Sequence, residues 1–389
     1  MKKVVFLTGT RADFGKLKTL MRACENSEKI ELYVYVSGMH LLPEYGNTYK
    51  EVLAENFKNV FLQNSRCDTL EMDKSLSVLI GDFADYVHSV RPDMIVVHGD
   101  RIDALAGAIV AMLNNILLAH IEGGEVTGTV DESMRHAISK MAHLHFVANQ
   151  EAKLRLVQLG ENEEHIYVIG SPDIDVMLSD EIPELNGVKS SLDINFNKYA
   201  ILIYHPVVSE EQHVYNDIRV IMKTLHETDE NFIVIYPNND TGTKHILTCY
   251  ANYEGDSRFK FFASIKFENF LSLLRGADYI IGNSSCGVRE ACVYGVPAID
   301  IGTRQQSRYS VNILPNIQHV SANEAEIKEA LNNIENFRVK SSYFGKGNST
   351  KLFMNILGQN IWNINTQKMF CDTQETQRAI ATYHSESVF

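Results

Sequence analysis

Residues 4–16, VVFLTGTRADFGK, place a four-residue apolar run directly before a glycine-bearing turn and an amphipathic stretch. The run Val4–Leu7 is too short for the apolar core of a secretion signal, so it predicts a buried strand. The turn Thr8-Gly9-Thr10 leads into a helix, and such a turn suits an anion at the helix N-terminus. The segment matches neither GxGxxG nor a Walker A loop, so a tight turn with a solvated Arg11 remains the alternative.

The same alternation of short apolar runs with longer amphipathic stretches continues to about residue 170. Strand, helix and strand at this spacing predict βαβ units and a parallel sheet covered on both faces. The predicted strands are Val4–Leu7, Leu32–Val36, Met94–Val97, Ile116–Ala119, Leu144–Val147 and Tyr167–Ile169. The predicted helices are Lys16–Glu25, Leu70–Val90, Asp103–Asn114, Glu132–Ala142 and Glu151–Leu159.

Turn signals such as Ser171-Pro172-Asp173 and Ile182-Pro183 mark a boundary, after which the alternation resumes. The later strands are expected at Ala200–Tyr204, Phe232–Tyr236, Phe259–Phe262, Tyr279–Ile281 and Ala298–Ile301, and the helices at Ser209–His226, Phe267–Arg275, Val288–Tyr294 and Glu324–Ile334. We therefore expect an α/β chain with Rossmann-like domains over residues 1–175 and 176–349. Residues 350–389 would form a helix, roughly 350–364, and a polar tail that frays. Two such domains in tandem would bind a ligand in the cleft between the carboxyl ends of both sheets.

The composition excludes several other classes of protein. Apolar residues make up 45%, aromatic residues 9% and charged residues 22%, an ordinary globular mix. The formal charge, 36 − 49 = −13, argues against nucleic-acid binding and against docking on an anionic membrane. No apolar run is long enough to span a membrane. The six cysteines form no CxxC and no zinc-type cluster, so we expect a cytoplasmic, metal-free protein with reduced thiols.

Three acidic residues of the first domain stand where they would face one cleft. Asp100 and Glu122 follow predicted strands, and Asp131 precedes a predicted helix. Each has a simpler alternative, because Asp100 could pair with a neighbouring base and Asp131 could cap the helix. As a set, however, clustered carboxylates suit general acid and base chemistry.

The second domain carries a segment suited to a pyrophosphate. In IGNSSCGVRE, residues 281–290, small hydroxyl residues and glycines open a helix after a strand. Their N–H and hydroxyl groups would hold the phosphates, Glu290 would accept hydrogen bonds from a ribose diol, and Arg304 adds a cation. Cys286 is expected to be a packing residue, because no base lies near it in the sequence.

Two further polar residues follow strands of the second domain. His205 can assist proton transfer or stabilise a departing phosphate, with a hydrogen-bonded structural histidine as the alternative. Asn238 lies in a segment that could simply form a turn.

Taken together, these residues resemble the hydrolysing UDP-N-acetylglucosamine 2-epimerases. That family includes bacterial sialic-acid pathway enzymes and the epimerase half of the animal bifunctional epimerase/kinase. The resemblance runs from the first strand to about residue 310, in order and with similar spacing. The segments that carry it are Thr8–Lys16, Gly38–His40, Tyr45–Thr48, His98–Arg101, His120–Glu125, Gly128–His136, His205-Pro206, Gly282–Glu290 and Gly302–Arg304.

The resemblance implies the GT-B architecture, two Rossmann-like domains with UDP in the cleft and a C-terminal helix that crosses back to the first domain. It also implies a mechanism. A carboxylate removes the proton at C2 of the sugar while UDP leaves C1, giving 2-acetamidoglucal. Water then adds across the double bond with inverted C2 configuration and releases N-acetylmannosamine.

Site residues follow from the resemblance position by position. The catalytic residues implied are Asp100, Glu122, Asp131 and His205, without an order among the acids. The substrate or UDP-binding residues implied are Arg11, Lys16, His40, Arg101, Asn238, Ser284, Ser285, Gly287, Glu290 and Arg304. The partner is a nucleotide sugar, UDP-GlcNAc, with no cofactor and no metal, and a homodimer or homotetramer is expected.

One short segment distinguishes the hydrolysing from the non-hydrolysing 2-epimerases. Non-hydrolysing 2-epimerases typically carry His-Val-Glu-Ala-Gly where this chain has HIEGGE, residues 120–125, which looks like the hydrolysing branch. Two substrates stay open, UDP-GlcNAc and a UDP-2,4-diacetamido-6-deoxy sugar of the legionaminic-acid pathway. The remaining alternatives are a non-hydrolysing epimerase, a GT-B glycosyltransferase and a non-catalytic nucleotide-sugar sensor, and the three acids argue against the last two.

Overall fold

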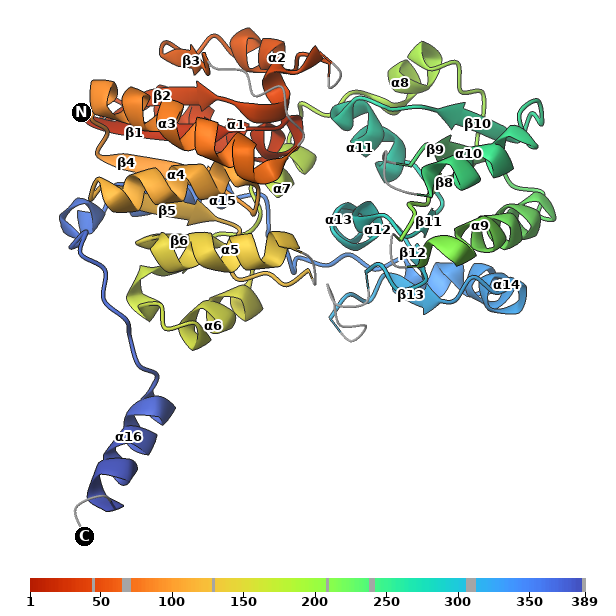
Figure 1. Cartoon of the computed structure of the whole chain (residues 1–389). Coiled ribbons are helices and arrows are strands. Elements are labelled where there is room, and N and C mark those ends of the chain that lie inside the picture. Colours follow the sequence, from red (N-terminus) through yellow and green to blue (C-terminus); the bar gives the residue numbers. More distant parts are fainter. Residues whose placement is uncertain are drawn as a thin grey trace. The chain divides into compact units, whose positions relative to one another are not determined.

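The computed structural model describes residues 1–43, 46–64, 71–127, 130–207, 210–237, 242–305 and 313–386. These residues form two compact units (Figure 1). Unit 1 comprises Met1–Val176 and Gly345–Phe389, and unit 2 comprises Met177–Phe344.

Unit 1 is built on a seven-stranded sheet in the order β3-β2-β1-β4-β5-β6-β7, with every neighbouring pair parallel. Its strands are β1 Lys2–Thr8, β2 Ile30–Val36, β3 Val60–Leu62, β4 Met94–His98, β5 Leu117–Ile121, β6 Leu144–Val147 and β7 Ile166–Val168. Its helices are α1 Arg11–Glu25, α2 Tyr49–Ala54, α3 Met72–Val90, α4 Ile102–Leu113, α5 Val130–Met141, α6 Gln150–Gln158, α7 Asp173–Met177, α15 Ser349–Leu357 and α16 Gln374–Glu386. Short 3₁₀ segments lie at Gly38–Leu41, Glu163–His165 and Asn360–Asn363.

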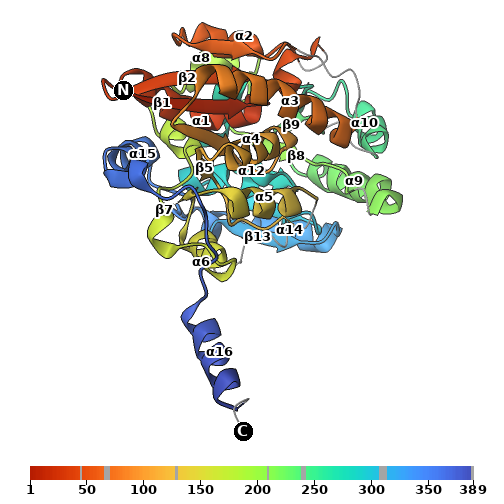
Figure 2. The ribbon, with the colours of Figure 1, turned by 60° about the vertical axis from the view of Figure 1, so that its left-hand side comes forward.

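Helices cover both faces of the unit 1 sheet because successive strand residues point to opposite sides. Val4 and Phe6 of β1 pack in one core with α1 and α15, whereas Val5 and Leu7 pack in another with α3 and α4. In Figure 1, α3, α4 and α5 lie in front of the sheet, and Figure 2 shows α15 on its other side.

The C-terminal segment differs from the sequence-based expectation in two ways. Helix α15 ends at Leu357, before Gly358, instead of continuing to residue 364. Helix α16 spans Gln374–Glu386, where we expected a fraying tail. Residues 345–349 group with unit 1, since the backbone of Gly345 packs against that of Gly170. The carboxylate of Asp175 accepts hydrogen bonds from the Ser349 and Thr350 N–H groups, which caps α15.

Unit 2 repeats the same topology with six parallel strands in the order β10-β9-β8-β11-β12-β13. Its strands are β8 Ala200–Ile203, β9 Phe232–Ile235, β10 Phe259–Phe262, β11 Ile280–Gly282, β12 Ala298–Ile301 and β13 Ile317–Val320. Its helices are α8 Leu185–Ser191, α9 Glu211–His226, α10 Thr243–Ala251, α11 Phe267–Arg275, α12 Ser285–Val288, α13 Glu290–Tyr294 and α14 Glu324–Asn332, with a 3₁₀ segment at Ile334–Phe337.

The strand orders fix where a ligand would bind in each sheet. In unit 1 the order reverses between β1 and β4, and in unit 2 between β8 and β11. Ligands of doubly wound sheets bind at such switch points, outside the carboxyl ends of the strands. The residues that follow these four strands are therefore the candidates for ligand contacts.

Candidate active site

A cavity of about 480 Å³ lies at the switch point of unit 1. The sequence-predicted residues Arg11, Lys16, Asp100 and Arg101 line it, together with Thr10, Ala12, Asp13, Met39, Thr48 and His98. These residues come from the turns after β1 and β4, from α1 and from the segment after β2. The fold thus brings two basic groups of α1 and the carboxylate of Asp100 to one opening.

The side chain of Asp13, a residue of α1, stabilises the start of that helix. Thr10 caps the helix, and the carboxylate of Asp13 accepts hydrogen bonds from the Gly9 and Thr10 N–H groups at 3.0 Å. The Thr8 hydroxyl donates to the same carboxylate at 2.7 Å. The anion at this turn is therefore Asp13 itself. Arg11, which lines the cavity, has its Nε 3.1 Å from the carboxylate of Glu51, and both side chains are 43% exposed.

His40 lies beneath this turn and is fully buried. Its Nε2 is 3.1 Å from the Thr8 hydroxyl, and its Nδ1 is 2.8 Å from the Thr48 hydroxyl. Burial lowers the pKa of His40, so the ring is neutral near pH 7. The structure thus places His40 as a support of the Thr8–Asp13 turn.

Glu122 follows β5 in a left-handed backbone conformation, with φ of 60°, and is 5% exposed. Its carboxylate accepts a hydrogen bond from Lys16 Nζ at 2.8 Å and lies 3.1 Å from His98 Nε2. The Ser171 hydroxyl donates to its other oxygen. These partners come from α1, β4 and the segment after β7, so three separate segments hold the one carboxylate that follows β5.

Helix α5 carries one of the predicted acids and the base that pairs with another. Asp131 is half-buried in its first turn, and Arg135 follows one turn later. The Arg135 guanidinium is 5% exposed, pairs with the carboxylate of Asp100 and donates to the Glu125 carbonyl at 3.1 Å. The base that pairs with Asp100 is thus Arg135, which is distant in sequence, and not the adjacent Arg101. Gly128 and Thr129 of the same motif lie outside the described residues.

In unit 2 the switch point joins His205 to Asn283. The Asn283 side chain accepts a hydrogen bond from the His205 N–H at 2.7 Å and donates to the His205 carbonyl at 2.8 Å. Arg304 donates to the Asn283 carbonyl at 3.1 Å. The structure therefore brings His205 and Arg304 together through Asn283, which is not among the predicted site residues.

The predicted pyrophosphate segment forms two short helices instead of one. Ser284 caps α12, and Ser285 and Gly287 lie within it. Glu290 begins α13 and is 9% exposed. Because α12 has only four residues, hydroxyl and guanidinium groups would bind phosphate here more than a helix dipole would. Burial raises the pKa of the Cys286 thiol, which agrees with a packing role. Asn238 lies outside the described residues.

Sequence reasoning did not include His98 or Ser171 among the site residues. His98 begins the quoted segment His98–Arg101, which was a usable signal. Ser171 stands in the turn Ser171-Pro172-Asp173, which we interpreted as a boundary. Only the fold places it on Glu122, because the segment after β7 passes the end of β5.

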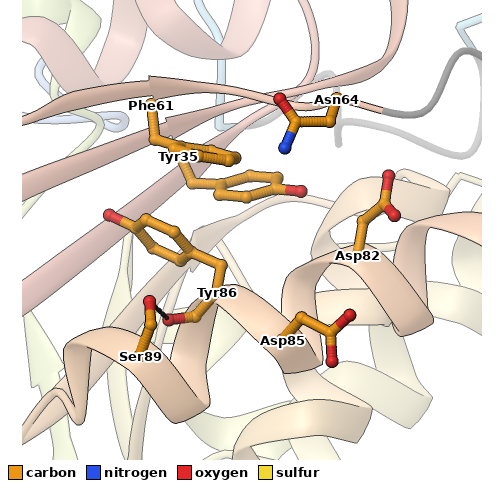
Figure 3. A pocket seen from close by; sticks show the side chains of 7 residues that line it. All are labelled: Tyr35, Phe61, Asn64, Asp82, Asp85, Tyr86 and Ser89. Atoms are coloured by element: carbon orange, nitrogen blue, oxygen red, sulfur yellow. Dashed lines mark hydrogen bonds between the residues drawn. The ribbon is translucent and has the colours of Figure 1, made fainter.

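A second cavity of unit 1, about 230 Å³, lies against β2, β3 and α3 (Figure 3). The rings of Tyr35 and Phe61 stack with centroids 5.4 Å apart, and the Ser89 hydroxyl donates to the Tyr86 carbonyl. Asn64, Asp82 and Asp85 complete its lining. These residues belong to the packing of the sheet edge on α3, and no sequence-predicted site residue is among them.

Buried neutral histidines predict acid sensitivity. Burial lowers the pKa of His120 to about 3, whereas an unfolded histidine has a pKa of about 6.5. The unfolded state therefore binds more protons, so the free energy of unfolding should fall as the pH drops below about 6.5 and should continue to fall to about 3. Urea denaturation at pH 7.5 and 5.0 measures this. A His120→Gln variant should show a smaller difference, and an equal difference would contradict the assignment.

Comparisons with known proteins identify the family. Residues 22–358 match the family model described as UDP-N-acetylglucosamine 2-epimerase. A UDP-N-acetylglucosamine 2-epimerase of Neisseria meningitidis is 42% identical over 375 residues, which cover 96% of this chain and 99% of that protein. A Legionella pneumophila protein named UDP-N,N'-diacetylbacillosamine 2-epimerase (hydrolyzing) is 34% identical over 85% of this chain and 89% of its own length. The chain belongs to the UDP-N-acetylglucosamine 2-epimerase family.

Solved structures agree with the fold. A crystal structure of UDP-GlcNAc 2-epimerase from N. meningitidis bound to UDP-GlcNAc matches with a TM-score of 0.79 at 19% identity, over 92% of this chain and 100% of that one. The Methanocaldococcus jannaschii enzyme in complex with UDP-GlcNAc and UDP matches with a TM-score of 0.74 at 22% identity, over 92% and 99%. The two parallel-sheet α/β domains of GT-B type are thereby confirmed. Across the described ranges, no helix combines the length and apolar character needed to cross a bilayer.

Proposed function

We propose that this protein is a hydrolysing UDP-N-acetylglucosamine 2-epimerase, which converts UDP-GlcNAc and water to N-acetylmannosamine and UDP for sialic-acid biosynthesis. The observation that carries the proposal is the fixed carboxylate of Glu122 beside Lys16 and His98 in unit 1. The 42% identical epimerase supports the substrate, and the Legionella relative named as hydrolyzing supports the reaction class. HIEGGE, residues 120–125, supports the same branch.

In the proposed mechanism the carboxylates of unit 1 stabilise the transition state and remove the C2 proton. The C2 proton of the sugar is not acidic, so cleavage of the C1–O bond must run ahead and build positive charge on the ring. Carboxylates near C1 and C2 stabilise that charge, and one of Asp100, Glu122 and Asp131 takes the C2 proton. UDP leaves with the C1–O bonding electrons. Water then adds to the 2-acetamidoglucal, with its hydroxyl at C1 and a proton at C2 on the inverted face.

Unit 2 supplies the contacts to UDP in this proposal. Arg304 and the hydroxyls of Ser284 and Ser285 would receive the phosphates, and Glu290 would accept hydrogen bonds from the ribose diol. His205, fixed through its backbone by Asn283, would stabilise the departing phosphate. We propose Arg11, Lys16, Arg101, Asn238 and Gly287 as further substrate contacts.

A second substrate has specific support. Relatives from L. pneumophila and Campylobacter jejuni, each 34% identical, are named as hydrolyzing epimerases of a nucleotide-linked N,N'-diacetylbacillosamine. That sugar differs from N-acetylglucosamine at C4 and C6. Comparing the turnover of the two nucleotide sugars therefore identifies the substrate of this protein.

Proton NMR of the protein with UDP-GlcNAc in deuterated water tests the proposal. We expect free N-acetylmannosamine with deuterium at C2, together with UDP. Formation of UDP-N-acetylmannosamine would assign the protein to the non-hydrolysing branch instead. Turnover only of UDP-N,N'-diacetylbacillosamine would overturn the substrate but keep the reaction.

Substitution of the proposed UDP contacts should weaken nucleotide binding. Removing the Arg304 guanidinium in Arg304→Ala should raise the Kd of UDP about 10-fold to 100-fold, since a hydrogen bond to a charged group contributes about 1.5–3 kcal/mol. Glu290→Ala should weaken UDP less. Isothermal titration calorimetry measures both. Arg338→Ala removes a guanidinium paired with Glu335 on the surface of unit 2 and serves as the control. Unchanged UDP affinity in both variants would contradict this placement.

A further inference from the structure

His120 is buried under the turns that carry two of the proposed catalytic acids. Its side chain is 0% exposed, as is that of Ser139. The ring Nε2 lies 2.8 Å from the Gly99 carbonyl and Nδ1 lies 2.9 Å from the Ser139 hydroxyl. Because a carbonyl only accepts, Nε2 carries the hydrogen and Nδ1 accepts from the hydroxyl. One neutral tautomer therefore satisfies both ring nitrogens.

This pair of side chains touches both turns. The Gly99 carbonyl belongs to the peptide group that leads into Asp100, and Gly99 itself has a φ of 70°. A Cβ atom on Gly123 would lie 2.7 Å from the Ser139 hydroxyl and 2.8 Å from His120 Nδ1. The backbone directly after Glu122 therefore packs against the pair. The Gly99 N–H also donates to the Ile121 carbonyl at 3.0 Å, so the two turns are joined to each other.

Helix α5 ties the same pair to the remaining acid. Asp131, Arg135 and Ser139 are spaced at four residues, which places them along one face of the helix. Arg135 pairs with Asp100 from this face, while Ser139 reaches His120. One face of α5 therefore carries Asp131, pairs with Asp100 through Arg135 and contacts His120 through Ser139.

We propose that His120 and Ser139 are positioning residues, which hold the turns of Asp100 and Glu122 in register with α5 without exchanging a proton with the substrate. The inference rests on the proposed function, because it concerns the acids of that reaction. A pKa of about 3 agrees with it, since such a ring stays neutral through the working pH range.

Kinetics of four variants of the full chain test the proposal. His120→Leu removes both hydrogen bonds and should lower kcat about 100-fold, the scale expected for a misplacement of about 1 Å, with the Kd of UDP unchanged. His120→Gln keeps an N–H for the Gly99 carbonyl and should restore kcat to within about 10-fold of the wild type. Ser139→Ala should lower kcat about 10-fold. Ser272→Ala, a buried serine of unit 2, is the matched control and should leave kcat unchanged.

A pH profile separates positioning from proton transfer. In His120→Gln both limbs of the kcat/KM profile should keep their midpoints, and loss of one limb would make His120 an acid or base and overturn the proposal. A folded His120→Leu variant with kcat within about threefold of the wild type would also overturn it, because a threefold change corresponds to only about 0.7 kcal/mol in the activation barrier. If Ser139→Ala and Ser272→Ala lowered kcat equally, Ser139 would have only a packing role, and its part of the proposal would be wrong.

Amide hydrogen exchange gives a readout that does not need turnover. In His120→Leu the peptides that contain residues 97–103 and 121–126 should exchange faster than in the wild type, while those of unit 2 should not change. Unchanged exchange at both turns would overturn the proposal even in an active enzyme. Absence of turnover in the wild type would instead overturn the proposed function, so the two failures are distinguishable.

Discussion

The Glu122→Gln variant should lose kcat by about 10³-fold or more while it binds UDP with wild-type affinity. A neutral amide cannot take a proton, and it carries no negative charge to pair with Lys16 Nζ, which lies 2.8 Å from the Glu122 carboxylate. General acid or base catalysis contributes about 10²–10⁴-fold, so the loss of one such group sets the expected scale. Turnover of UDP-GlcNAc by NMR and UDP titration by calorimetry measure the two effects separately.

The other two acids should behave in the same way. Asp100→Asn and Asp131→Asn are each expected to abolish turnover with UDP binding largely intact. Asp100→Asn also removes the partner of buried Arg135, so its thermal midpoint must be compared with that of the wild type. Glu55→Gln is the matched control, because Glu55 is a partly buried glutamate of unit 1 that is paired with Arg22. Near-normal activity in any one of the three acid variants would remove that residue from the mechanism.

Gly282→Ala should lower the free energy of unfolding by about 3 kcal/mol or more. Gly282 has a φ of 130°, which a residue with a Cβ rarely adopts, and that Cβ would lie 2.0 Å from the Ile203 carbonyl oxygen. Backbone of β8 cannot move aside as the end of a flexible side chain can. The strain would separate β8 from β11 and disturb the hydrogen bonds between Asn283 and His205.

Gly287→Ala is the control for that substitution. Gly287 lies in α12, and its new Cβ would make an ordinary contact, 3.5 Å from Ala298 Cβ. The thermal midpoints of the two variants, followed by circular dichroism, should therefore differ by several degrees, with Gly282→Ala the lower. Equal midpoints would show that the β8–β11 junction relaxes more easily than its geometry indicates.

The interior strands could be predicted because they are continuous apolar runs. The runs Val4–Leu7 and Met94–Val97 stand between turn signals, and they lie in β1 and β4, respectively. The edge strands β3 and β13 were missed, since β3 has only three residues and β13 interrupts its apolar ends with Gln318 and His319; the equally short edge strands β7 and β10 were predicted. A short, partly exposed strand leaves little periodic signal, and its identity as a strand depends on the neighbour that pairs with it.

The local sequence by itself determined the alternation of strands and helices, the two α/β units and the positions of the acids after their strands, because these depend on periodicity and on neighbouring residues. Only the tertiary structure decided the partners of each group. Arg135 pairs with Asp100 across 35 residues, and Lys16 pairs with Glu122 across 106. Such pairs form because parallel strands bring their carboxyl ends to one edge, and no pattern along the chain records which side chains meet there.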